Sequence, residues 1–104
     1  MAPHNILDKY HILAGELAAV EGKSAKASLN YRSGILHATS ERRLGIAGLA
    51  NDRLARHFVE QGDLDSALPV MDEAIKLFRE WGADAVVERM EGMRETAIAT
   101  KAQD

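Results

Sequence analysis

The chain has 104 residues, of which 46% are hydrophobic and 28% are charged, so it is long enough for one small domain with one core and too short for two. A net charge of −3 gives no electrostatic footprint for nucleic acid, and zero cysteines exclude disulfides, thiolate metal sites and cysteine nucleophiles. The sequence shows no secretory signal and no apolar run approaching the roughly 18 residues of a membrane span. We therefore expect a cytoplasmic protein that binds neither nucleic acid nor membranes.

Apolar residues recur at helical spacing along the chain, which predicts five helices and no strands. The expected helices cover about residues 6–21, 24–38, 41–61 and 84–100, together with a fourth helix that starts between residues 63 and 65 and ends at residue 81. Gly22, Gly62 and Gly82 are expected to end the first, third and fourth helices. Asn5 and Ser40 are expected to cap the starts of the first and third. Such short turns force neighbouring helices to lie antiparallel, so the sequence predicts a run of helical hairpins.

The sequence pattern of the first hairpin repeats at an offset of forty residues. The two copies are GELAAVEGKSAKASLNYRSGI (residues 15–35) and ARHFVEQGDLDSALPVMDEAI (residues 55–75). Small residues match at Gly15 with Ala55 and at Ala27 with Ala67, and large ones match at Tyr31 with Met71. We expect the small residues to let two backbones cross closely while the large ones fill the space around the crossing.

The second copy resembles the tetratricopeptide repeat in both residue types and spacing. Its matching residues are Leu54, Ala55, Phe58, Gly62, Asp63, Ala67, Met71 and Ala74. The resemblance implies one all-α domain over residues 1–104, a short α-solenoid with two repeats (about 6–39 and 41–81) and a capping helix (about 84–100). The period departs from the usual length of about 34 residues, which implies longer helices. Pro69 also requires the fourth helix to begin shortly before it.

Three segments resemble one particular group of tetratricopeptide-like proteins. They are DKYHILAGELAAVEG (residues 8–22), GLANDRLARHFVEQGDLDSA (48–67) and FREWGADAVVERM (78–90). They are similar to the tetratricopeptide-like tail of large signalling proteins, in which a protein-kinase-like domain and an AAA-type ATPase precede the repeats and histidine-kinase domains often follow. The chain contains no phosphate-binding loop and no kinase motif of such proteins. The resemblance therefore implies a scaffold or linker, either as a piece or as a relative of a signalling protein.

We find no residue pattern for catalysis, a metal or a cofactor. His4, His11, His37 and His57 lie in four segments, without the spacing of a helical metal pair. The expected fold places no His and Asp beside Ser24, Ser33 or Ser40, and the acidic pairs near the turns suit helix capping better than acid–base chemistry. We expect the protein not to be an enzyme.

Trp81 and the Met90–Met93 pair have two interpretations each. Trp81 is expected to plug the contact between the fourth and fifth helices, with a partner-binding anchor as the alternative. Met90 and Met93 are expected in the core against the fourth helix, with an adaptable binding surface as the alternative.

A binding surface follows from the resemblance, because the first helix of each tetratricopeptide hairpin lines a concave face. Transferred to this chain, that face contains Lys9, Ile12, Glu16, Ala19, Val20, Leu49, Asp52, Arg56, Val59 and Glu60. Its mixture of charged and apolar residues suits an extended or helical segment of another protein. The alternative is an ordinary solvated face.

Self-association is the second functional hypothesis, since a short array of repeats leaves apolar ends. The first helix carries more apolar residues than one covered face needs, and we expect a homodimer through Leu7, Tyr10, Leu13 and Leu17. The fifth helix has a charged outer side that includes Glu88, Glu91 and Glu95, as expected of a cap.

Overall fold

The described part of the chain consists of helices joined by turns of two or three residues. The structure is a computed structural model that describes residues 6–103. The helices are α1 (Leu7–Val20), α2 (Ser24–Ser40), α3 (Leu44–Glu60), α4 (Leu64–Trp81) and α5 (Asp84–Ala102). No strand occurs in these residues, and the predicted all-α class with five helices is confirmed.

The turns repeat every 20 residues around a residue with left-handed backbone conformation. These residues are Gly22, Arg42, Gly62 and Gly82, with φ of 75°, 57°, 76° and 89°. The residue after each donates its backbone N–H to the carbonyl five residues earlier, at 2.8 to 2.9 Å. This Schellman arrangement satisfies the last carbonyls of the helix and reverses the chain within one turn. Each helix therefore lies against the next one.

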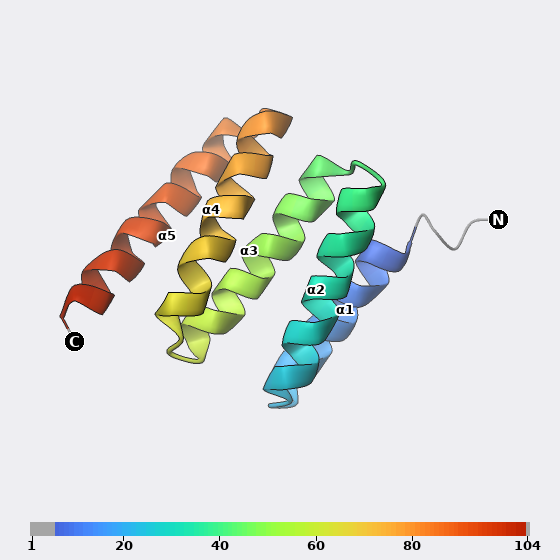
Figure 1. The fold of residues 1–104 in the computed structure, drawn as a ribbon, viewed down its shortest axis with the longest axis horizontal. Coiled ribbons are helices and arrows are strands. Elements are labelled where there is room, and N and C mark those ends of the chain that lie inside the picture. The colour runs from blue at the N-terminus through green and yellow to red at the C-terminus, as the bar shows by residue number, and fades with distance from the viewer. Residues whose placement is uncertain (1–5, 104) are drawn as a thin grey trace.

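The helices lie side by side in chain order, with α1 and α5 at opposite ends of the stack (Figure 1). Each helix packs against the next, and α1 also contacts α3. This is the predicted stack of antiparallel helical hairpins. None of the helices within residues 6–103 combines the length and the apolar character that crossing a bilayer requires.

The small and large residues of the repeat have the packing roles that were predicted for them. Ala27 and Ala67 are fully buried, and Tyr31 and Met71 are each only 1% exposed. A Cβ atom added at Gly15 would lie 2.8 Å from the ring of Tyr31, so the α1–α2 crossing requires the absence of a side chain there. The close crossing is therefore built from matched small and large positions.

The boundary between α2 and α3 was predicted wrongly. The helix α2 continues through Ser40, which is its last residue and not the cap of the next helix, and α3 begins at Leu44. Residues 41–43 form the turn, with Arg42 in the position that glycine holds elsewhere. Arg43 then extends to α1, where one of its side-chain nitrogens lies 3.6 Å from Oδ2 of the buried Asp8.

The other helix ends lie close to their predicted positions. Asn5 lies outside the described residues, and the residue before α1, Ile6, provides no side-chain cap. Asp63 caps α4 by accepting the backbone N–H of Ser66 at 3.2 Å. At the C-terminal end α5 continues to Ala102, so it is longer than predicted.

Candidate interaction surface

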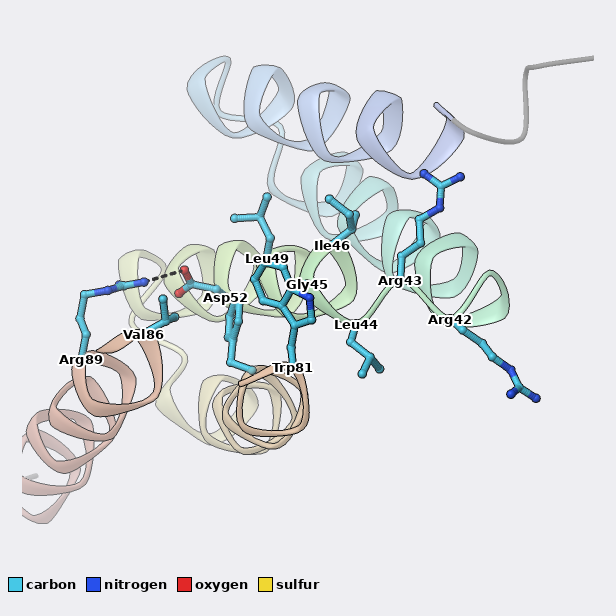
Figure 2. A pocket seen from close by; sticks show the side chains of 11 residues that line it. Arg42, Arg43, Leu44, Gly45, Ile46, Leu49, Asp52, Trp81, Val86 and Arg89 are labelled. Carbon is cyan, nitrogen blue, oxygen red and sulfur yellow. Dashed lines mark ion pairs between the residues drawn. The ribbon is translucent and has the colours of Figure 1, made fainter. Parts of the chain in front are cut away.

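Two hollows flank α3, and Leu49 lines both of them. The smaller, about 280 Å³, lies between α1 and α3 and is lined by Lys9, Ile12, Leu13, Glu16, Leu49 and Arg53. The larger, about 600 Å³, lies between α3, the end of α4 and the start of α5, and its lining includes Leu49, Asp52, Trp81, Val86 and Arg89. Figure 2 shows the side chains of the larger hollow. We call the two hollows together the α3 groove.

Positive charge is concentrated in the α3 groove. Its basic side chains are Lys9, Arg42, Arg43, Arg53 and Arg89, and its acidic ones are Glu16 and Asp52. The lining therefore carries +3, because five basic residues face two acidic ones, although the whole chain carries −3. Lys9 and Arg42 form no ion pair with any residue of the described part. An acidic ligand would meet an attractive potential in this groove.

Trp81 lies at the end of α4 and faces the larger hollow (Figure 2). Its side chain is 60% exposed, and its ring packs on Gly45 in the first turn of α3, where an added Cβ would lie 2.9 Å from the ring. The expectation that Trp81 plugs the contact between α4 and α5 is therefore wrong. Val86 lines the same hollow from α5, so the exposed indole forms part of an apolar wall.

Asp52 connects α3 to α5 at the floor of the larger hollow. Its side chain is only 4% exposed, and Oδ1 accepts a hydrogen bond from Nε of Arg56 at 3.1 Å. A side-chain nitrogen of Arg89 lies 3.5 Å from Oδ2, as the dashed line in Figure 2 shows. A buried carboxylate needs such partners because removal from water disfavours its charged form. The two arginines, each about half exposed, supply the compensating charge.

A second charged cluster supports the smaller hollow. The hydroxyl of Tyr31 donates a hydrogen bond to Oε2 of Glu16 at 2.7 Å, and the other oxygen of Glu16 is paired with Arg53. Burial, followed by the hydrogen bond to Glu16, raises the pKa of the Tyr31 hydroxyl well above its usual range. The cluster therefore connects Glu16 of α1 to Tyr31 of α2 and to Arg53 of α3.

The predicted binding residues do not all lie together. Lys9, Ile12, Glu16 and Leu49 line the smaller hollow, Asp52 lines the larger, and Arg56 pairs with Asp52. Val59 lines a different hollow, of about 480 Å³, between the end of α3, the start of α4 and the second half of α5. Val20 and Glu60 are exposed and line none of these three hollows.

Sequence reasoning missed Arg42, Arg53, Val86 and Arg89. The fifth helix was interpreted only as a cap, yet the offset of forty relates Ile46 to Val86, and these two residues line the same hollow. Extending the offset of forty to the fifth helix would therefore have predicted that α5 lines this hollow.

The predicted self-association residues lie mostly on one exposed face of α1. Tyr10, Leu13 and Leu17 are 61%, 69% and 60% exposed, whereas Leu7 is half-buried. Val20 of α1 is also exposed, as is Ile6, which immediately precedes the helix. The core side of α1 is formed instead by Asp8, Ile12, Gly15 and Ala18.

Three of the histidines contact side chains of other helices. His57 is buried and places Nε2 3.0 Å from the hydroxyl of Ser24. The His11 and His37 rings stack with centroids 5.3 Å apart. No cluster of three or more metal-ligating side chains occurs in residues 6–103. Met90 is fully buried with residues of α4, as expected, and Met93 is partly buried.

No protein-family model, curated protein or solved structure matches this chain.

Proposed function

We propose that this chain is a non-catalytic, tetratricopeptide-like module for protein–protein interaction, and that the α3 groove binds an acidic segment of another protein. The observation that carries the proposal is the +3 charge of the groove lining in a chain of −3. Apolar contacts would come from Leu49, Trp81 and Val86, which lie between the basic side chains. A segment that alternates acidic and apolar residues would complement both features.

Arg42 gives this proposal independent support. It is the only residue other than glycine with positive φ in the described chain, and L-residues adopt that conformation at an energetic cost. Arg42 lines the edge of the larger hollow, where its side chain extends away from Trp81 (Figure 2), and it forms no ion pair with a described residue. Strained residues tend to be found at functional sites, and a cation held there without a partner suits the capture of an acidic ligand.

The cellular setting belongs to the same proposal. The similarity to the helical tail of signalling proteins and the absence of cysteine both fit a scaffold in the reducing cytoplasm.

The single tryptophan makes this proposal directly testable, because Trp81 lies in the groove. A short synthetic peptide of Leu, Ala and Glu would be titrated into the protein, in parallel with a peptide in which Lys replaces every Glu. We expect the acidic peptide to shift the Trp81 emission and its affinity to fall as salt is added. Equal binding of both peptides, or binding of neither, would contradict the proposal.

A pair of charge reversals separates the groove from the rest of the surface. Arg42→Glu changes the groove, whereas Lys26→Glu makes the same change in net charge on an exposed position of α2. We expect Arg42→Glu to weaken binding of the acidic peptide at least tenfold, about 1.4 kcal/mol, and Lys26→Glu to weaken it far less. Equal losses would mean that only net charge matters.

A further inference from the structure

The exposed face of α1 has the residue spacing of a helix-pairing seam. Ile6, Tyr10, Leu13, Leu17 and Val20 follow one another at intervals of four, three, four and three, and all five side chains are exposed. This is the heptad pattern of a and d positions, with Tyr10 and Leu17 at a. We call these five residues the α1 seam. It lies opposite the side on which α1 packs against the rest of the chain.

The equivalent face of α3 is covered by a helix in part, because Arg53 and Glu60, the counterparts of Leu13 and Val20, are exposed. At the offset of forty, Tyr10 corresponds to Ala50 and Leu17 to His57, and both of those residues are buried. Ala50 belongs to the core cluster that contains Tyr31 of α2, and His57 is hydrogen-bonded to Ser24 of α2. Tyr10 and Leu17 of the α1 seam thus match positions that, in the next hairpin, pack against the preceding helix.

The opposite end of the stack does not fit this seam. Glu88, Glu91 and Glu95 are exposed on α5, so head-to-tail stacking of α5 on α1 would bury carboxylates against apolar side chains. Two α1 seams can instead cover each other about a two-fold axis, which closes the assembly at two copies.

We propose that the α1 seam binds the α1 seam of a second copy of this chain in antiparallel orientation. In this arrangement Tyr10 packs against Leu13 of the second copy, and Ile6 packs against its Leu17. The flanking charges select the register, because Lys9 then lies opposite Glu16 of the second copy, twice by symmetry. Parallel pairing would place Glu16 beside Glu21 of the second copy, which is a like-charge contact.

This proposal does not depend on the segment that binds in the larger hollow. The α1 seam reaches the α3 groove at the smaller hollow, because Leu13 belongs to the seam and also lines that hollow beside Lys9 and Glu16. The seam contributes no residue to the larger hollow, so each copy keeps its larger hollow open. The dimer would therefore carry two such hollows and would increase the avidity for a partner with two acidic segments.

The test begins with molar mass by light scattering across a dilution series of the complete chain. We expect the mass to rise with concentration from 11.4 kDa toward twice that value. Leu13→Glu should keep the protein at 11.4 kDa with its helical circular dichroism unchanged. Leu36→Glu is the matched control, because Leu36 is 71% exposed on α2 while Leu13 is 69% exposed on α1. A monomer at every concentration, or equal effects of both substitutions, would overturn the proposal.

Engineered cysteines then distinguish the two orientations, since the chain contains no cysteine of its own. In the antiparallel dimer, the Ile6→Cys variant mixed with the Leu17→Cys variant should form a mixed disulfide under mild oxidation. Neither variant should cross-link to itself, because two copies of position 6 would lie about 16 Å apart at 1.5 Å per residue, beyond disulfide reach. Self-cross-linking of each variant alone would show a parallel pair and overturn the antiparallel register.

Discussion

Arg42 and Gly62 occupy the same position in two Schellman turns, although one is an arginine and the other a glycine. Their φ values are 57° and 76°, and the residues after them, Arg43 and Asp63, each donate a backbone N–H to the carbonyl five residues earlier at 2.9 Å. Only glycine adopts this conformation without a penalty from Cβ. The chain therefore places a strained arginine at the edge of the larger hollow.

Arg42→Gly should stabilise the protein and weaken its binding of the acidic peptide. Glycine removes the energetic cost of the left-handed conformation in the folded state, and it also raises the conformational entropy of the unfolded state. The first effect is larger, so we expect the free energy of unfolding to rise by up to about 1 kcal/mol. Urea denaturation measures this change, and Trp81 fluorescence should show weaker binding of the acidic peptide. The converse substitution, Gly62→Arg, should lower stability by a similar amount. A loss of stability in Arg42→Gly would mean that contacts of the arginine side chain outweigh the strain.

The Asp52–Arg89 pair should couple α3 to α5. Asp52→Asn leaves the site filled but removes the charge, and we expect a loss of about 1 to 2 kcal/mol in the free energy of unfolding. A double-mutant cycle with Arg89→Gln isolates the pair, and a coupling of about 0.5 to 1 kcal/mol is expected because Arg89 is half exposed. The cycle with Arg56→Gln provides the comparison within α3. Purely additive effects of Asp52→Asn and Arg89→Gln would contradict a role for this ion pair in holding α5.

The helices and their hairpin order could be predicted because local signals agree with the fold. Gly22, Gly62 and Gly82 mark three of the four turns, and the apolar spacing between them is helical. The turn at Arg42 was missed because no glycine marks it. Its conformation depends on the helices at either side, and sequence statistics favour a helix start at Glu41 instead.

The groove could be predicted in part, through the repeat. Lys9, Ile12 and Glu16 were predicted to lie beside Leu49 because positions forty residues apart occupy equivalent helices, and all four residues line the smaller hollow. The repeat could not predict that the Trp81 side chain lies in the larger hollow, because this position depends on the angle at which the end of α4 crosses α3 at Gly45. Such crossing angles arise from tertiary packing, which residue spacing does not encode.

Ionisation of Tyr31 should make stability fall at alkaline pH. Burial and the hydrogen bond to Glu16 raise the folded-state pKa above the unfolded value of about 10, so the folded state keeps the proton longer. The stabilisation is fully present below about pH 10 and is lost as the pH rises further. Urea denaturation at several pH values should therefore give a steeper decline for the wild type than for Tyr31→Phe. Parallel declines would show that Tyr31 does not contribute.

The contact between Gly45 and Trp81 should report on the groove itself. A Cβ at Gly45 would lie 2.9 Å from the indole, and the exposed ring can turn toward solvent to avoid it. We expect Gly45→Ala to shift the tryptophan emission to longer wavelength and to weaken binding of the acidic peptide. The net change in stability should be small, because alanine also favours the helix by about 1 kcal/mol. Gly92→Ala is the control, since a Cβ there has no neighbour within 4 Å. It should raise stability by about 1 kcal/mol and leave the emission unchanged. An unchanged emission in Gly45→Ala would show that the indole does not need Gly45 to hold its place in the groove.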